Sequence, residues 1–225
     1  MLKILIERFR QGCRTMAYPA GKPPVLHRRY RGRPIIAGQN VPLDLGKHTF
    51  APDTGSEFSN LFQMAASSRE ALVLNRDHDE MVFQVNRDIV RLFGRSLRLR
   101  QVSAGGCNAC ELDINVLNTP VFDLSRFGIQ FTASPRHADG IMVTGPVTRN
   151  MRDALLKTYE AVPEPKLVIA VGACAISGGL FAESPEVTTG LDSLIPVDLY
   201  IPGCPPHPLT ILDGLLRLTG RLQDK

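Results

Sequence analysis

The second half of the chain repeats one pattern, in which an apolar run leads into a glycine- or proline-rich loop and then into a helical stretch. The apolar runs are ADGIMVTG, KLVIAVGA and VDLYIPG. LRLRQVS before them alternates apolar and polar residues as a strand does, and a further short strand is predicted at 129–132. Helices are predicted in ELDINVLN, at 148–160 and in PPHPLTILDGLLRL. Strands that are mostly apolar and alternate with helices are typical of a parallel sheet covered on both faces. The pattern therefore predicts a three-layer α/β fold with a doubly wound, flavodoxin-like parallel sheet.

The first 96 residues lack this regularity. LKILIERFRQ places Leu2, Leu5, Ile6 and Phe9 on one helical face and its charged residues elsewhere, which predicts a short basic amphipathic helix. Such a helix suits a membrane surface, a groove on a partner or its own domain. Residues 18–52 hold six prolines without a sustained period, which predicts an extended arm that orders mainly against something else.

Two further elements are predicted before the regular region begins. A helix is predicted at 57–74, and HDEMVFQVNRDIVRLFGRSLRLRQV predicts short strands or a helix that ends at Gly94. The chain is thus predicted to divide into a docking extension at 1–96 and an α/β domain at 97–225.

The charge balance is uneven and bears on partners and location. Nine of the first 33 residues are Lys or Arg and one is acidic, which suits anionic lipids or an acidic partner. Nucleic acid is not expected as a partner, because no nucleic-acid-binding motif accompanies the charge. No apolar run is long enough to span a bilayer, and the charged first residues do not form a secretory signal. We expect a cytoplasmic protein with reduced thiols.

Four of the five cysteines fall in comparable places. Cys107 and Cys110 follow a predicted strand in SAGGCNACELDI, and Cys174 and Cys204 each follow another. Loops after the carboxyl ends of parallel strands lie along one edge of the sheet, so we expect these four thiols to converge there. Cys13 is remote from them in sequence and is interpreted as a plain thiol.

Four thiols at one edge could be buried as small hydrophobic groups, hold zinc, or hold a [4Fe–4S] cluster. Glycine-rich loops favour a cluster, because they let backbone amides approach the sulfurs closely. Structural zinc usually uses two close pairs of cysteines, whereas here one pair and two single cysteines come from three loops. One [4Fe–4S] cluster is therefore the favoured interpretation, and a zinc-stabilised scaffold is the alternative from another class.

Four motifs in this order resemble a known family. CNACE, SPRHADGIMVTGPVTRNM, GACAISGG and VDLYIPGCPPHP, spread over about residues 100–218, are similar to the cluster-bearing small subunit of membrane-bound [NiFe] hydrogenases, including formate hydrogenlyase, and to the B subunit of complex I. The complex I branch has adjacent cysteines in the first motif. Here Asn108 and Ala109 separate Cys107 from Cys110, so the resemblance favours the hydrogenase branch.

The resemblance implies an electron-transfer subunit in which Cys107, Cys110, Cys174 and Cys204 ligate one [4Fe–4S] cluster. It implies a large catalytic partner subunit that could carry nickel and iron, a ferredoxin-like subunit and membrane-arm subunits. It further implies peripheral attachment at the cytoplasmic face of the inner membrane and no turnover by this chain alone. The alternative within the family is a B subunit of a NADH-quinone oxidoreductase that passes electrons to quinone.

Two further expectations concern single features. Glu111 directly follows the second cysteine and is either a proton relay near the cluster or an acid that favours the start of a helix. ILIERFRQGCRTMAYPAGKPPVLHRRYRGRPII resembles the opening of the ferredoxin-type subunit, yet AGQNVPLDLGKHTFAPDTG follows without a cysteine. Residues 1–96 are therefore interpreted as a cluster-free remnant of that subunit, with a docking role.

Overall fold

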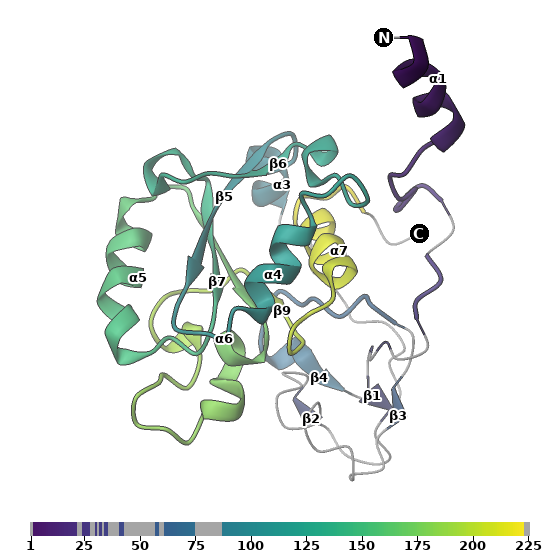
Figure 1. The fold of residues 1–225 in the computed structure, drawn as a ribbon. Helices are drawn as coiled ribbons and strands as arrows, with labels where there is room; N and C mark the ends of the chain where they lie inside the picture. The colour runs from purple at the N-terminus through teal and green to yellow at the C-terminus, as the bar shows by residue number, and fades with distance from the viewer. Residues whose placement is uncertain are drawn as a thin grey trace.

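The fold is seen in a computed structural model, which describes residues 2–21, 24–27, 30, 32, 34–35, 41–42, 57–58, 61–74 and 87–222. Its centre is a five-stranded sheet in the order β6-β5-β7-β8-β9, with every pair parallel (Figure 1). In chain order this is 2-1-3-4-5, the flavodoxin-like doubly wound arrangement. The predicted fold class is confirmed. The strands are β5 (Leu97–Ser103), β6 (Ile129–Phe131), β7 (Gly140–Thr144), β8 (Leu167–Val171) and β9 (Leu199–Ile201).

Helices cover both faces of the sheet and make it the middle of three layers. The helices are α4 (Ala109–Val116), α5 (Arg149–Ala161), α6 (Ala173–Ser177) and α7 (Pro208–Leu218). Side chains of α4 and α7 pack with one face of the strands, and those of α5 and α6 pack with the other. The three strands β7, β8 and β9 are buried along their whole length, as strands covered on both faces must be.

Short connecting helices complete this region. They are the 3-10 turns η3 (Leu124–Phe127), η4 (Pro135–His137), η5 (Gly179–Phe181) and η6 (Leu191–Ser193). The strands and the three longer helices follow the sequence predictions, whereas α6 was expected to be loop. It is five residues long and lies between glycines, so its sequence has too few turns to show a helical period.

The described residues of the amino-terminal region include the helices α1 and α3 and several very short strands. Helix α1 (Leu2–Gln11) is confirmed, and every one of its residues is exposed. Helix α3 (Arg87–Phe93) ends just before Gly94, as predicted. Two two-residue pairs also form, β1 (Pro34–Ile35) with β3 (Glu57–Phe58) and β2 (Val41–Pro42) with β4 (Val73–Leu74).

The helix predicted at 57–74 is wrong. Within that range the structure has β3, irregular backbone from residue 61, the 3-10 turn η2 (Glu70–Leu72) and β4. Ala66 instead exchanges two backbone hydrogen bonds with Tyr200 of β9, at 3.0 and 2.8 Å. The segment thereby covers the free edge of β9, and this long-range pairing outweighs the local helical preference.

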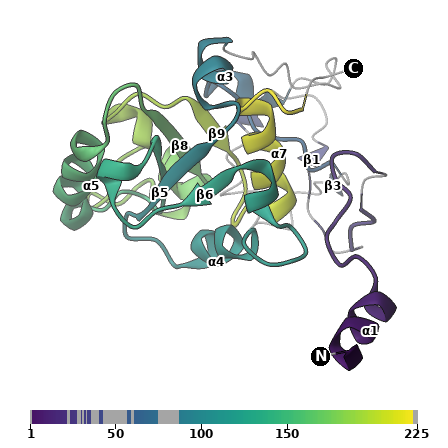
Figure 2. The ribbon, with the colours of Figure 1, turned by 90° about the horizontal axis from the view of Figure 1, so that it is seen from above.

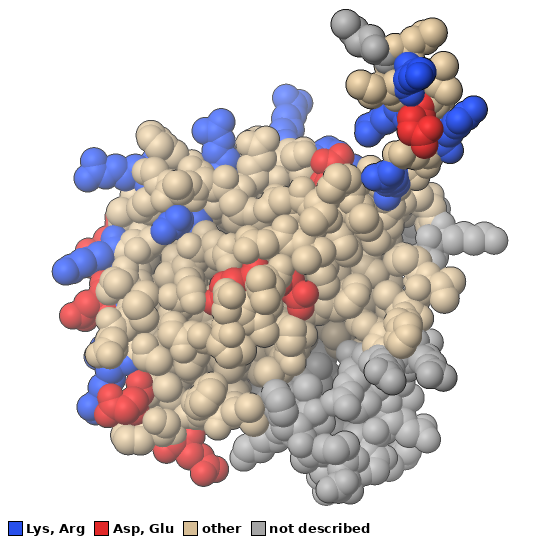
Figure 3. Space-filling model, in the orientation of Figure 1, with Lys and Arg blue, Asp and Glu red and all other residues tan. Residues whose placement is uncertain are grey.

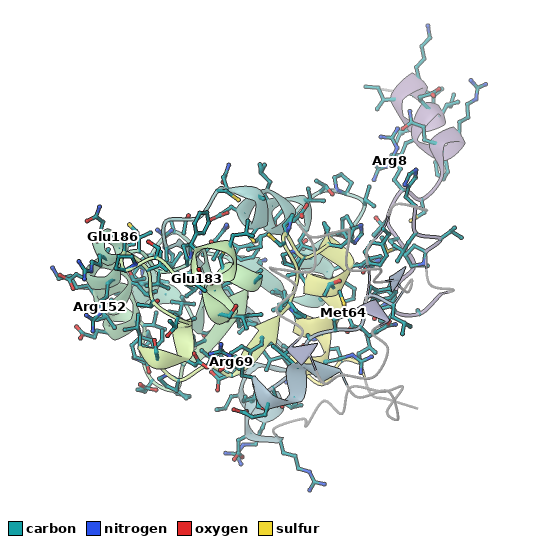
Figure 4. The ribbon with its side chains drawn as sticks, turned by 90° about the horizontal axis from the view of Figure 1, so that it is seen from below. Arg8, Met64, Arg69, Arg152, Glu183 and Glu186 are labelled. Carbon is teal, nitrogen blue, oxygen red and sulfur yellow. The ribbon has the colours of Figure 1, made fainter. Side chains whose placement is uncertain are left out.

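Several described residues between α1 and residue 97 pack into the cores of the α/β domain. Tyr18, Phe62 and Ala65 join the core on the α7 side, and Met64, Ala66 and Leu72 join the core on the other side. Seen from below, the segment carrying Met64 and Arg69 lies along the domain, where Arg69 pairs with Asp192 at 3.2 Å (Figure 4). The expected arm at 18–52 is therefore ordered in part by its own domain, while most of the cysteine-free stretch at 37–55 lies outside the described residues. The boundary between a docking extension at 1–96 and an α/β domain at 97–225 stays a prediction.

Among the described helices, none is both long enough and apolar enough to span a bilayer.

Candidate metal centre

Four cysteines lie in the three segments that follow strands β5, β8 and β9 at the carboxyl edge of the sheet. Cys107 lies in the loop after β5 and Cys110 in the first turn of α4. Cys174 lies in the first turn of α6, directly after β8, and Cys204 lies between β9 and α7. The carboxyl ends of parallel strands face one edge, so the fold delivers all four thiols to the same rim.

The four thiols lie near enough to interact electrostatically. Cys110 interacts with the other three, Cys174 with Cys107 and Cys204, and Cys204 with Cys107. The structure therefore brings together the four cysteines that the sequence singled out. Cys13 stays exposed beyond α1, where its thiol approaches the carbonyl oxygen of Thr15 at 3.7 Å.

Burial and the neighbouring charges favour the protonated form of Cys110, Cys174 and Cys204 in the free protein. Burial, followed by the charges of Glu111 and the other cysteines, raises the pKa of Cys110 far above its ordinary value. Burial and the neighbouring cysteines raise the pKa of Cys174 to about 11, and burial also raises the pKa of Cys204. Thiolates are the form of cysteine that binds metal. The positive charge of bound iron would offset the cost of burying these thiolates and the repulsion between them.

Two glycines make room for the sulfurs. A Cβ on Gly172 would lie 2.6 Å from the Cys110 sulfur, and one on Gly179 would lie 3.1 Å from the Cys174 sulfur. Both glycines have positive φ, +87° and +53°, which disfavours a side chain there as well. The backbone after β8 thus lies close to the Cys110 sulfur, and glycine at residue 172 permits this close approach.

The carboxylate of Glu111 is buried beside the first pair. Its Oε1 accepts hydrogen bonds from Ser103 Oγ and Thr144 Oγ1, both at 2.6 Å. These donors come from the ends of the neighbouring strands β5 and β7, so the carboxylate ties the start of α4 to the sheet edge. Ser103 and Thr144 are not among the residues predicted from the sequence, although their place at strand ends beside the cysteines was an available signal.

His207 has a structural role in the last of these loops. Its Nδ1 accepts a hydrogen bond from the backbone N–H of Leu209 at 3.1 Å, which caps α7. Its ring packs edge-on against Tyr30, with centroids 5.2 Å apart. Burial lowers the pKa of His207, which keeps its Nδ1 available as an acceptor.

The donor set fits an iron–sulfur cluster. Within the described residues, no three His, Cys, Asp or Glu side chains gather in a way that would hold a single metal ion. A cluster occupies the space between its ligands, so its cysteines need not close on one point. Four cysteine thiols, with glycines that let the backbone approach two of the sulfurs, fit such a group.

Exposed apolar side chains flank the cysteine loops. Leu112 is 58% exposed on α4, two residues after Cys110. Leu180 and Phe181 are 50% and 47% exposed in η5, just after the loop of Cys174. The face over α4 carries few charges apart from a small acidic group (Figure 3). Exposed apolar groups beside a buried centre are typical of a protein contact surface.

Comparison with known proteins adds independent findings. A family profile described as "NADH ubiquinone oxidoreductase, 20 Kd subunit" matches residues 107–218. The chain is 43% identical over 147 residues to formate hydrogenlyase subunit 7 of Escherichia coli (strain K12), covering 65% of this chain and 58% of that relative. It is 44% identical over 122 residues to the B subunit of NADH-quinone oxidoreductase from Heliobacterium modesticaldum, covering 54% of this chain and 70% of that relative.

A solved structure is similar as well. It is a chain of the membrane-bound sulfane sulfur reductase, an archaeal respiratory membrane complex, with 36% identity and a TM-score of 0.52. The likeness covers 58% of this chain and 72% of that one. The matched region of the formate hydrogenlyase relative is under two thirds of its length.

Proposed function

This chain belongs to the family of the 20 kDa subunit of NADH ubiquinone oxidoreductase, and from that premise we propose that it is an electron-transfer subunit with one [4Fe–4S] cluster. Cys107, Cys110, Cys174 and Cys204 would hold the four irons. The observation that carries the proposal is the meeting of these thiols from three βα loops at one sheet edge.

The chain's own residues would hold and shield the cluster. Bound there, a [4Fe–4S] cluster supplies reversible transfer of one electron. Gly172 and Gly179 let the backbone approach the sulfurs, and Glu111 fixes the start of α4 through Ser103 and Thr144. The role of Glu111 as a proton relay stays a prediction.

Of the two activities in the family, we favour the hydrogenase type. The C-x-x-C spacing of the first motif supports it, as does the similarity to formate hydrogenlyase subunit 7. The alternative is a B subunit of the quinone-linked type, which the similarity to the Heliobacterium modesticaldum relative supports. In either case the reaction would be completed by a large catalytic subunit.

The large subunit would dock beside the cluster. Leu112, Leu180 and Phe181 surround the cysteine loops with exposed apolar surface, which a partner would cover and so shield the cluster from water. A ferredoxin-like subunit and membrane-arm subunits would complete the complex. The assembly would lie at the cytoplasmic face of the inner membrane, with this chain attached peripherally.

Spectroscopy of the anaerobically purified full chain tests the cluster. We expect a brown protein whose iron–sulfur absorption bleaches on reduction with dithionite and returns on reoxidation. The reduced form should give a cluster signal by electron paramagnetic resonance. A colourless protein that takes up zinc would instead support the scaffold alternative and overturn the relay.

The sequence and metal content of the large subunit distinguish the hydrogenase type from the quinone-linked type. Affinity purification of the complex and sequencing of its large subunit would support the hydrogenase type if that subunit carries two C-x-x-C pairs and the complex contains nickel. A large subunit without those pairs, in a complex that reduces quinone, would support the alternative.

A further inference from the structure

Helix α1 carries an apolar face that nothing in the described structure covers. Leu2, Leu5, Ile6 and Phe9 lie on that face and are 72%, 55%, 45% and 85% exposed. At about 100° per residue these four side chains fall within one arc of the helix surface. Figures 1 and 2 both show α1 standing away from the α/β domain, so the domain leaves this arc open.

Positive charge borders the apolar arc on both sides. At the same angular spacing, Lys3 and Arg10 fall on one side of the arc and Arg8 on the other. The acidic residue of α1, Glu7, lies on the opposite face and approaches Arg10 at 4.0 Å. The blue groups around α1 in Figure 3 show this basic character. Lys and Arg beside an apolar arc can reach anionic headgroups while the arc enters the acyl boundary.

Only a few residues separate α1 from backbone that is hydrogen-bonded to the α/β domain. The helix ends at Gln11, and the N–H of Met16 already donates to the carbonyl oxygen of Val121 at 2.8 Å. Two residues later the phenol of Tyr18 donates to the buried carboxylate of Asp213 on α7 at 2.6 Å. The few intervening residues span less than about 20 Å even when extended. Any surface that holds α1 therefore also holds the α/β domain close to it.

We propose that α1 lies in the surface of an anionic lipid membrane, with its apolar arc in the acyl boundary and its basic flanks on the headgroups. This deepens the proposed function and rests on it, because it assigns the membrane contact of a peripheral subunit to one helix. Lipid is favoured over a protein groove because both flanks of the arc are basic, which matches a uniformly anionic surface. Four apolar side chains and their basic flanks give reversible binding, which co-sedimentation detects at high lipid concentration and to which the contacts of the complex would add.

Vesicle co-sedimentation of the full chain tests this proposal. We expect the purified protein to pellet with phosphatidylcholine vesicles that contain phosphatidylglycerol and to stay in solution with phosphatidylcholine alone. Raising the salt concentration should release it, because screening weakens attraction between exposed charges. Equal binding to both kinds of vesicle, or binding to neither, would overturn the proposal.

Matched variants separate the apolar arc from general hydrophobicity. Phe9→Gln should weaken binding to anionic vesicles by roughly tenfold or more. Ile4→Gln is the control, since Ile4 is 74% exposed but falls outside the arc, and it should bind nearly as the parent does. Equal losses in the two variants would contradict the assigned face. Loss of a partner chain from the purified complex in Phe9→Gln, without loss of vesicle binding, would show that α1 docks into protein and would overturn the proposal.

The optical spectrum separates this proposal from the cluster. Phe9→Gln should keep the colour and iron content of the parent, because α1 stands away from the domain that carries the cysteine rim. Vesicle binding by a colourless protein would leave the α1 proposal standing while the electron-transfer proposal fails.

Discussion

The amino-terminal segments and the α/β domain are ordered in different ways. The domain follows its own alternating pattern, and its strands bury apolar side chains against the helices that alternate with them along the chain. The described segments before residue 75 contain little regular structure beyond α1 and are ordered by contacts with residues far along the chain, such as Ala66 with Tyr200. The structure of the α/β domain is thus determined by its local sequence pattern. The backbone of segments such as that around Ala66 is determined by contacts with the domain. The five cysteines show the same division, with four in the domain and one in the extension.

Replacing cysteines should separate the two regions most sharply. We expect Cys174→Ser or Cys204→Ser to abolish most cluster binding, because each removes one of four thiolates held by separate elements. The iron content and visible spectrum of each variant measure this. Cys13→Ser is the control from the extension and should keep the iron content of the parent. Full iron content in Cys174→Ser would refute the assigned ligand set.

The same leucine truncation should have unequal effects on stability. Leu99 is fully buried in β5, whereas Leu5 is 55% exposed on α1. Leu99→Ala should lower the free energy of unfolding by about 2–5 kcal/mol, because it removes buried methyl groups and leaves a cavity. Leu5→Ala should change it by less than about 0.5 kcal/mol. Urea unfolding compares the two, and equal losses would mean that α1 packs on the domain in solution.

Two glycines with positive φ allow a finer comparison. Gly172 has φ +87°, and a Cβ added there would clash with the Cys110 sulfur. Gly12 has φ +64°, and a Cβ added there would meet no neighbouring atom. Each alanine variant should lose about 1–2 kcal/mol from backbone strain. Gly172→Ala should in addition lower the iron content, because the Cys110 sulfur must move. If Gly12→Ala and Gly172→Ala retain iron equally, the loop after β8 does not shape the centre.

The smallest effect is expected where the two regions meet. Tyr18→Phe removes a hydrogen bond of 2.6 Å to Asp213, whose carboxylate still accepts from Arg217 at 2.9 Å. We expect a loss of about 0.5–1.5 kcal/mol in the free energy of unfolding, the usual net contribution of one hydrogen bond. Tyr30→Phe is the matched control, since its hydroxyl lies 3.4 Å from Thr210 Oγ1, and it should cost less than about 0.5 kcal/mol. A negligible effect of Tyr18→Phe in urea unfolding would mean that the arm is not anchored through Asp213.

Much of the α/β domain could be predicted from the sequence, because its signals are local. Runs such as KLVIAVGA are apolar along almost their whole length and lead directly into glycine, so β8 and its end are evident. Helix α6 was missed because five residues between glycines show no period. The helix expected at 57–74 was wrong because edge pairing with β9 determines that backbone, and residue 66 carries no sign of a partner at residue 200.

The candidate site was predictable to a similar extent. Each of the four cysteines of the domain follows a strand, and the geometry of a parallel sheet brings the segments after these strands to one edge. The contacts that finish the site depend on spatial neighbours. Ser103 and Thr144 become donors to Glu111 only once β5 and β7 lie side by side. Likewise, the need for glycine at residue 172 follows from a sulfur 62 positions earlier in the chain.

The most direct test of the cluster is the metal and sulfide content of the anaerobically purified full chain. We expect about four iron atoms and about four acid-labile sulfides per chain, with zinc at trace levels. One zinc per chain with neither iron nor sulfide would contradict it.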